Sequence, residues 1–329
     1  MPRRRVVLAA IAVALVAAAG AVAWSYNTDL ARARAALGEG ALIAETAAGR
    51  IEYADRGSGP PLLSIHGAGG GFDQGLANAA DLVGAGYRVI APSRFGYLGT
   101  AVPADPLPAR QADAHAALLD TLGIDRAVVV GVSAGARSAL ELALRHPQRV
   151  SALVLIVPGT YAPESPVMIE ESRGSQLAFA LVNAGADFAW WSLEKLAPDV
   201  LTRFLGVPPE LLARVSPAER ARAEAIRASV QPLSRRVAGI NVDSRPDLAP
   251  LPLEKIAAPT LVISARDDLF NTRPAAEHAA AGIPGARLIV YENGGHLLVG
   301  RQAEARAAVA SFLATAGLAP GAVLGAATR

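Results

Sequence analysis

The amino-acid sequence predicts an α/β fold in which a doubly wound, mostly parallel sheet carries an inserted helical cap. Short runs rich in Val, Ile and Leu alternate with longer segments of helical composition, as in sheets covered by helices on both faces. This alternation stops between residues 158 and 258, where helical segments continue without a convincing strand. With 52% hydrophobic residues among 329, the chain is long and apolar enough for a large core.

The first residues predict a membrane anchor. Three arginines at positions 3–5 precede an uncharged apolar run over residues 6–24, which as a helix would be roughly 28 Å long, close to the hydrocarbon thickness of a bilayer. The arginines favour a cytoplasmic N-terminus, so we expect residues 1–28 to hold the folded domain on the extracytoplasmic side. The alternative interpretation is a signal segment, because Ala21-Val22-Ala23 resembles a cleavage site. Cleavage there would leave a secreted protein.

The rest of the chain divides into a stalk, a core, a cap and a tail. The expected stalk is a helical segment at 29–48, the core spans 49–157 and 259–315, the cap spans 158–258, and the flexible tail is 316–329. The core strands are expected at 61–65, 87–91, 127–131, 152–157, 260–264 and 287–291, with an edge strand near 51–53. The helices between them are expected at 74–84, 105–122, 134–146, 272–281 and 302–314. Two roles are open for the aromatic residues of the cap: they line a substrate pocket, or they only pack the cap onto the core. These residues are Phe179, Phe188, Trp190, Trp191 and Phe204.

The sequence Gly131-Val132-Ser133-Ala134-Gly135 predicts a nucleophilic serine. A serine hydroxyl attacks a substrate only when a base takes its proton and the backbone presents it. The strand before this motif and the helix after it place Ser133 on a sharp turn, and a glycine two positions to either side leaves room for that turn. Without the strand and helix, the same motif would indicate only a tight structural turn.

A glycine-rich loop follows the strand at 61–65, with the sequence His66-Gly67-Ala68-Gly69-Gly70-Gly71. A tetrahedral intermediate carries its negative charge on an oxygen, which two backbone N–H groups can hold. We expect Ala68 and Ala134 to supply these N–H groups, with Gly67 letting the backbone come close and His66 holding the loop by hydrogen bonds. A phosphate-binding loop is the rival interpretation, but no Lys-Ser or Lys-Thr pair follows.

The base is predicted at His296. The strand at 287–291 leads into Gly294-Gly295-His296, where paired glycines give the ring freedom to reach Ser133. Of the other histidines, His115 and His278 lie in helical patterns and are expected at the surface, and His146 lies at a helix end.

The acid is predicted just after the strand at 260–264. Asp267 and Asp268 both stand there, and a carboxylate at a strand end is well placed to orient an imidazole. The chain order serine, acid, histidine is the order expected for a nucleophile on such a strand–turn–helix motif.

From about residue 45 to residue 314, the chain resembles the α/β-hydrolase superfamily in these motifs. In that family the acid usually stands three positions after a glycine that follows the strand. Ala265 takes the place of this glycine, so the resemblance selects Asp268 as the acid and leaves Asp267 in reserve. Ser93 and Phe95 depart from the family's usual Asp-x-Arg-Gly-x-Gly loop, as in relatives of carbon–carbon bond hydrolases.

The resemblance, with serine at position 133, implies hydrolysis of a carboxylic ester of an apolar small molecule through an acyl-serine. One alternative is a carbon–carbon bond hydrolase of the ring-cleavage-product type, and another is a membrane-tethered binding protein without chemistry. We expect no cofactor, and no metal because neither a His-x-x-x-His pair nor an acidic cluster with ligand spacing is present. The net charge is only +2, and the sequence has no stripe of basic residues of the kind that binds nucleic acid, so we expect no nucleic-acid partner. The chain has no cysteine, which excludes catalysis by a thiolate.

Overall fold

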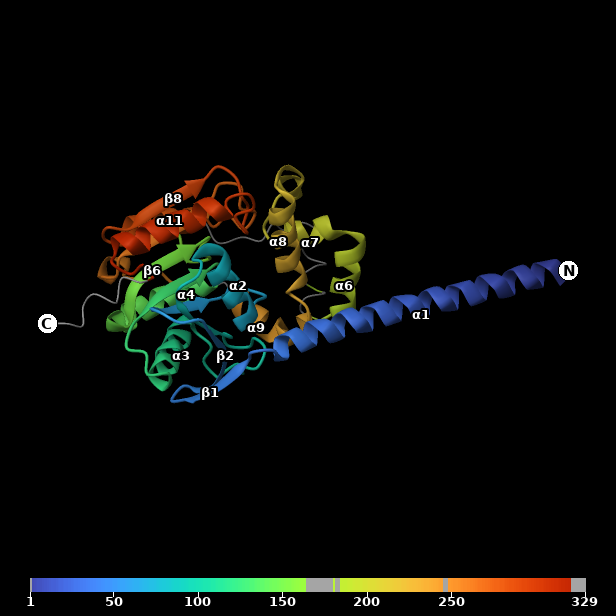
Figure 1. Cartoon of the computed structure of the whole chain (residues 1–329), viewed down its shortest axis with the longest axis horizontal. Helices are drawn as coiled ribbons and strands as arrows, with labels where there is room; N and C mark the ends of the chain where they lie inside the picture. The colour runs from blue at the N-terminus through green and yellow to red at the C-terminus, as the bar shows by residue number, and fades with distance from the viewer. Residues whose placement is uncertain (1, 164–179, 181–183, 245–247, 321–329) are drawn as a thin grey trace.

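The computed structural model describes residues 2–163, 180, 184–244 and 248–320, and the α/β fold class predicted from the sequence is confirmed (Figure 1). The described strands form one sheet in the order β1-β2-β4-β3-β5-β6-β7-β8. The pairs from β4 through β8 are parallel. Strand β2 pairs antiparallel with both β1 and β4, so one edge of the sheet is antiparallel.

The strands are β1 (Leu42–Thr46), β2 (Gly49–Arg56), β3 (Pro61–Ile65), β4 (Arg88–Pro92), β5 (Ala127–Val132), β6 (Val150–Ile156), β7 (Thr260–Ala265) and β8 (Arg287–Tyr291). The helices of the core are α2 (Phe72–Leu82), α3 (Pro108–Thr121), α4 (Gly135–Arg145), α10 (Arg273–Gly282) and α11 (Gln302–Thr315). Between β6 and β7, the described residues form helices α6 (Asp187–Leu196), α7 (Pro198–Phe204), α8 (Pro217–Ala228) and α9 (Val237–Asp243).

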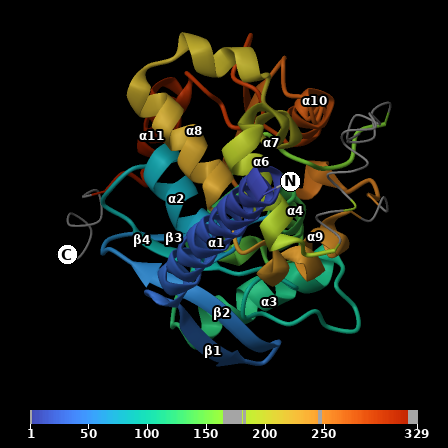
Figure 2. The ribbon, with the colours of Figure 1, turned by 90° about the vertical axis from the view of Figure 1, so that its right-hand side faces the viewer.

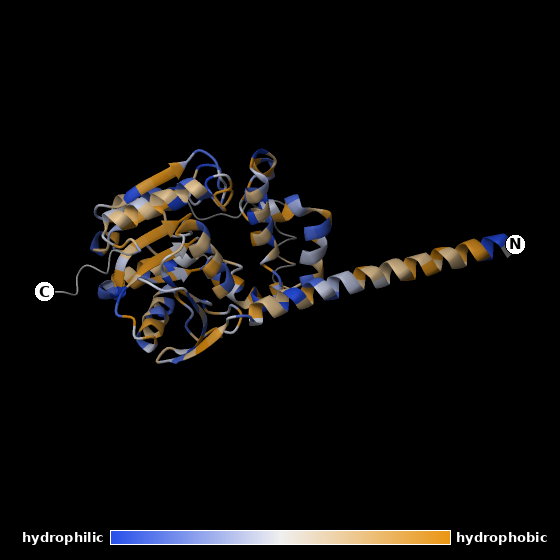
Figure 3. Cartoon of the chain, viewed as in Figure 1, coloured by the Kyte–Doolittle hydropathy of each residue, from blue (hydrophilic) through white to orange (hydrophobic). Residues whose placement is uncertain are grey.

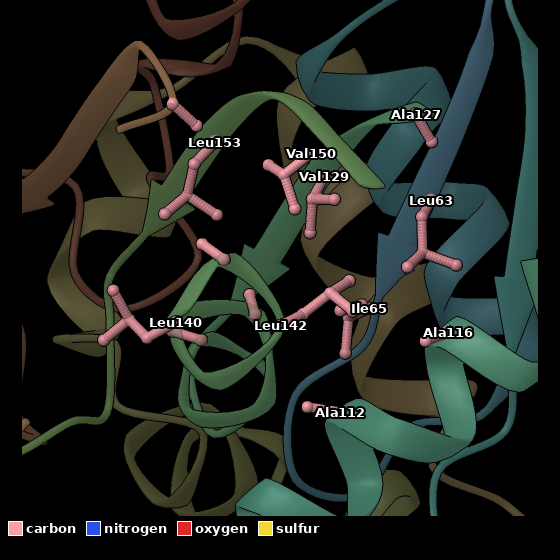
Figure 4. Packing of buried hydrophobic residues seen from close by; sticks show 14 of the residues in the cluster. Leu63, Ile65, Ala112, Ala116, Ala127, Val129, Leu140, Leu142, Val150 and Leu153 are labelled. Atoms are coloured by element: carbon pink, nitrogen blue, oxygen red, sulfur yellow. The ribbon is translucent and has the colours of Figure 1, made fainter. Parts of the chain in front are cut away.

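The sheet is buried on both faces. Successive side chains of each strand point to opposite faces, and a hydrophobic cluster covers each face. Val129 of β5 and Ile65 of β3 pack with Leu140 and Leu142 of α4 on one face (Figure 4). On the other face, neighbouring β5 residues such as Val130 join a cluster with side chains of α2 and α11. Each fully buried Val, Leu or Ile contributes about 2 kcal/mol to folding, so these two clusters fix the strand ends that carry the site.

The segment before the sheet differs from the stalk expected at 29–48. Helix α1 runs without a break over Pro2–Gly38, and residues 42–46 form strand β1 instead of continuing the stalk. Strand β1 was missed from the sequence because only one of its residues, Ala44, is buried. Its sequence therefore has no alternation of apolar and polar residues that would predict a strand. Among the described residues, α1 is the helix long and apolar enough to span a membrane, with a mean hydropathy of 2.7 in its most apolar window (Figure 3).

In the segment expected as a cap, residues 158–258, the described secondary-structure elements are helices. Its helices α6, α7 and α8 lie beside the sheet on the side from which α1 projects (Figures 1 and 2). Phe179 and most of the helix expected around it lie outside the described residues, as do residues 321–329 of the expected tail. We refer to residues 158–258 as the cap below.

Candidate active site

Ser133 lies on a strained turn between β5 and α4. Its φ is +52°, in the left-handed region that side chains rarely adopt. The turn is held by a hydrogen bond from Ser133 N–H to the Ile156 carbonyl at 2.9 Å. A Cβ added at Gly131 would lie 2.7 Å from Ala139 Cβ, and one at Gly135 would lie 2.4 Å from the His66 carbonyl oxygen. Close packing therefore leaves no room for a side chain at either glycine.

His296 and Asp268 are joined by a hydrogen bond between Nδ1 and Oδ2 at 2.8 Å. The Asp268 carboxylate also accepts from the Thr272 hydroxyl and, at 2.9 Å, from the Phe270 N–H. Both side chains of the pair are almost fully buried, which strengthens their electrostatic interaction. Ser133 and His296 line the same cavity, and no direct hydrogen bond joins their side chains in the described part of the chain.

The neighbouring carboxylate, Asp267, has a different partner. Its two oxygens accept from the backbone N–H groups of Gly295 at 2.8 Å and Gly294 at 3.2 Å. Asp267 therefore holds the backbone of the loop that ends in His296, while Asp268 holds the ring. The two adjacent aspartates divide the support of one histidine between them.

The glycine-rich loop brings Ala68 to the cavity wall beside Ser133 and Ala134. Among the described residues, no backbone carbonyl accepts a hydrogen bond from the N–H of Ala68 or Ala134. A Cβ added at Gly67 would lie 3.1 Å from Ser133 Cβ, so glycine allows the loop to approach the serine closely. The Gly67 N–H is held by Gln74 Oε1 at 2.9 Å, which fixes the start of the loop.

His66 is buried and contacts both the glycine-rich loop and the backbone of Arg94. Its Nε2 accepts from the Arg94 backbone N–H at 2.9 Å, and its Nδ1 lies 2.7 Å from the Gly67 carbonyl. These contacts require a neutral ring with the proton on Nδ1. Burial and the nearby Arg94 guanidinium hold the pKa of His66 well below its ordinary value, so the ring stays neutral.

A buried ion pair that sequence reasoning missed connects the cap to the glycine-rich loop. Asp243, at the end of α9, binds the Arg94 guanidinium through two oxygens at 2.8 and 2.5 Å. It also accepts from the Tyr97 hydroxyl at 2.5 Å, and that hydroxyl accepts from the Gly69 N–H at 3.3 Å. Nothing in the local sequence links Asp243 to these residues, because the contact spans the boundary between cap and core.

Replacing Asp243 with asparagine should lower the free energy of unfolding by about 3 kcal/mol, since a buried guanidinium would lose its charged partner. Burial raises the pKa of Asp243, but Arg94 and Arg137 lower it further, and its pKa ends below the ordinary value. This stabilisation is therefore complete above the unfolded-state pKa and is lost as pH falls through the folded-state pKa. Urea unfolding should show a difference between wild type and Asp243→Asn that is constant near neutral pH and shrinks below about pH 4.

A second residue missed from the sequence, Gly206, connects the cap to the histidine loop. Its carbonyl accepts hydrogen bonds from the N–H of His296 at 3.0 Å and from the N–H of Leu269 at 3.1 Å. Its φ is +78°, and an added Cβ would lie 2.6 Å from His296 Cβ and 2.7 Å from the Phe270 ring. A glycine between two cap helices carries no catalytic signature in sequence, so only the fold identifies it.

We expect Gly206→Ala to lower kcat/KM by more than about tenfold and the unfolding free energy by about 2 kcal/mol, because the methyl group must displace His296 or Phe270. Gly123→Ala is the matched control, since Gly123 has a φ of +63° and open space around its Cβ position. The control variant should lose stability from backbone strain alone and keep its activity. Equal activity in the two variants would contradict this role of Gly206.

The cavity beneath the cap has a volume of about 650 Å³, within the range of small-molecule sites. Trp190 and Phe204 of the cap line it, whereas Phe188 and Trp191 pack instead around Tyr26 of α1. The expected pocket role of the cap aromatics therefore applies to two of the four that are described. The surface of the remaining wall is mainly apolar and includes the aliphatic side chains of Ile226, Val230, Leu233 and Ile240.

The expectation that His115 lies at the surface is wrong. It lies fully buried in α3, with Nε2 3.2 Å from the Ser138 hydroxyl, and burial lowers its pKa to about 3. Among the described residues, no group of three or more His, Asp or Glu side chains is arranged to hold a metal ion. The expected absence of a metal and of a cofactor stays a prediction.

Comparisons with known proteins place this geometry in context. A family model described as alpha/beta hydrolase fold matches residues 60–300. The 2-hydroxy-6-oxo-6-phenylhexa-2,4-dienoate hydrolase of Comamonas testosteroni is 30% identical over 257 residues, which cover 75% of this chain and 84% of that protein. The 2-hydroxymuconate semialdehyde hydrolase of Pseudomonas putida is 32% identical over 279 residues, covering 81% and 92%. A solved alpha/beta hydrolase fold protein from Nakamurella multipartita has a TM-score of 0.66 at 30% identity, covering 83% of this chain and 98% of its own.

Proposed function

The chain belongs to the α/β-hydrolase family and is a hydrolase, and from that premise we propose that it cleaves an ester or related acyl bond of an apolar molecule with Ser133 as nucleophile. One observation carries this proposal: His296, hydrogen-bonded to Asp268, lines one cavity with a serine held on a strained turn. A nucleophile, a base and a group that orients the base are the parts that acyl transfer requires.

In the proposed acylation step, His296 Nε2 takes the proton of Ser133 as Oγ attacks the substrate carbonyl carbon. The carbonyl oxygen becomes negatively charged, and the N–H groups of Ala68 and Ala134 stabilise it. When the intermediate collapses, the bond to the leaving alcohol breaks and His296 returns the proton to that alcohol. Asp268 stabilises the imidazolium that exists between these two transfers.

In the proposed deacylation step, water enters the place of the alcohol. His296 takes a proton from water, the hydroxide oxygen adds to the acyl carbon, and Ser133 Oγ leaves with the proton that His296 gives back. The sum of the two steps is one ester and one water converted to one acid and one alcohol.

A neutral, apolar substrate fits the charges of the cavity. Besides His296, the side chains of its described lining that carry a formal charge at neutral pH are Asp81, Asp243, Arg137 and Arg222, and these charges cancel. Arg222 lies near Asp81 and binds Glu219, and the hydrogen bonds of Arg137 end on the carbonyls of Gly159 and Asp243. The wall therefore offers no excess of positive charge for a substrate carboxylate, which favours an uncharged ester.

A second candidate is hydrolysis of a carbon–carbon bond, and the names of the relatives favour it. The dienoate and the semialdehyde in those names contain no ester, so water must cleave a carbon–carbon bond in them. The same serine and histidine would serve that reaction. Such substrates carry a carboxylate, and the balanced charge of the present cavity is the feature that argues against them.

The two candidates are separated by measuring kcat/KM for a series of p-nitrophenyl esters of increasing chain length and for vinylogous diketone acids. We expect hydrolysis of the esters, with kcat/KM rising with acyl length because the cavity wall is mainly apolar. Higher kcat/KM for the diketone acids than for every ester would replace the first candidate with the second.

We also propose that α1 anchors the hydrolase to a membrane with the catalytic domain on the extracytoplasmic side. The arginines at positions 3–5 and the exposed apolar run after them support this orientation. The alternative, a cleaved signal segment, predicts a soluble protein that lacks these residues. Fractionation and mass determination of the mature chain test the proposal, and an intact chain in the cytosol would exclude both versions.

A further inference from the structure

Helix α1 is exposed along its apolar part and packed along the part that follows. The described side chains of residues 3–24 are all exposed. After them, Tyr26, Leu30 and Leu37 are buried or half-buried, at spacings of four and seven residues that place them on one helix face. Packing against the domain therefore begins where the apolar run ends, which is the depth at which a membrane helix would leave the bilayer.

The cap helix α6 is the element that meets α1 at this depth. The Tyr26 ring lies edge-on to Phe188 and Trp191, with centroid distances of 5.2 and 5.7 Å. One turn further, Asp29 accepts from Trp191 Nε1 at 3.0 Å and pairs with Lys195 Nζ at 3.1 Å. Tyr26 is only about 3 Å along the helix axis from the end of the apolar run, so the proposed anchor would place Phe188 at the level of a bilayer interface.

Large apolar side chains stay exposed on this part of the cap. Phe188 on α6 is 50% exposed, Leu196 at its end is 84% exposed, and Val200 on α7 is 44% exposed. In the described cap, no other large apolar side chain is this exposed, and the exposed residues of α8 are mainly alanines, with Arg220 and Glu224. The large exposed apolar side chains of the described cap thus lie on α6, which contacts α1, and on α7, which follows α6 in the chain.

The same two helices line the cavity with their inner sides. Trp190 of α6 is 3% exposed and borders the cavity, as does Phe204 of α7. Phe188, two residues before Trp190, points away to the surface. Helices α6 and α7 are therefore a wall one helix thick between the substrate cavity and the surface beside α1.

Building on the proposed anchor and esterase activity, we propose that Phe188, Leu196 and Val200 form a docking surface for the lipid bilayer, and that the enzyme takes its apolar ester from that bilayer. Continuity with α1 identifies the occupant: the helix that enters the bilayer is joined to α6 by ring contacts and by the Asp29–Lys195 pair. An amphipathic surface of this kind binds where apolar side chains enter the acyl boundary.

The absence of cysteine from the chain allows a direct test with the full-length protein in phosphatidylcholine vesicles. We expect an environment-sensitive fluorophore on Leu196→Cys to shift to shorter wavelength and to be quenched by nitroxide-labelled lipid. The matched control is Leu107→Cys, because Leu107 is 51% exposed and lies on the loop before α3, away from α1. Equal, water-like emission at both positions would overturn the proposal, as would a shift at Leu196→Cys that depends on protein concentration, which would indicate a second copy instead.

Kinetics separate this inference from the proposed function. The double variant Leu196→Glu/Val200→Glu should lose about tenfold in turnover of a long-chain ester held in vesicles and stay within about twofold for a short water-soluble ester. Equal turnover of wild type and variant on both esters would refute the docking surface and leave the esterase proposal intact. If wild type hydrolyses neither ester, the proposed function itself is wrong, and the fluorophore result alone then decides whether the cap binds lipid.

Discussion

Replacement of Ser133 with alanine is expected to lower kcat/KM for the best ester by at least about 10⁴-fold, because the nucleophile and its activating base act as one unit. Stability should change little, since alanine keeps the Cβ and the left-handed backbone of the turn. A fluorophosphonate probe should label the wild-type protein and fail to label Ser133→Ala. Near-identical urea unfolding curves for the two proteins would assign the loss to chemistry.

The matched control for this experiment is Ser138→Ala, because Ser138 is a buried serine of α4, the helix that follows the Ser133 turn. Its hydroxyl donates to the Gly135 carbonyl at 3.3 Å and contacts His115 behind the turn. Labelling of Ser138→Ala should be retained, with activity within about fivefold of wild type. Labelling of Ser133→Ala would show that the nucleophile is elsewhere, and a folded wild type that resists the probe would favour the non-catalytic binding protein.

The fold was predictable from sequence where burial repeats locally. The parallel strands are short apolar runs because both faces of the sheet are covered, and such runs stand out between helices. Strand β1 was not predictable, since it lies at an edge and buries only Ala44. His115 was misjudged because its own helix gives it a surface-like pattern, whereas α4 packs over it and supplies Ser138.

The residues that hold the site together were less predictable than those proposed to react. Ser133 directly follows a strand and stands between two glycines, and His296 follows a glycine pair in the loop after a strand, so each has a local sequence motif. Asp243 and Gly206 lie in the cap, and their importance comes from contacts with residues more than sixty positions away. No local sequence pattern predicts such a contact, because the contact depends on how the cap packs against the core.

Of the two adjacent aspartates, Asp268 is expected to matter far more for the rate. Asp268→Asn should lower kcat/KM by about 10⁴-fold, because an amide can present its N–H₂ to Nδ1 and favour the wrong tautomer of His296. Asp267→Asn should cost only about tenfold, since it weakens hydrogen bonds to the Gly294 and Gly295 backbone without changing the ring's partner. Steady-state kinetics on one ester, with thermal unfolding of both variants, measure the difference.

The comparison is sharp because the two variants make the same chemical change one residue apart, at the same strand end. Both replace one carboxylate with one amide, so a difference in rate reports which partner each aspartate holds. A larger loss in Asp267→Asn than in Asp268→Asn would transfer the role of acid to Asp267. Comparable losses would mean that backbone support and ring support limit the reaction equally, and that the 2.8 Å contact between Asp268 and His296 does not by itself identify the acid.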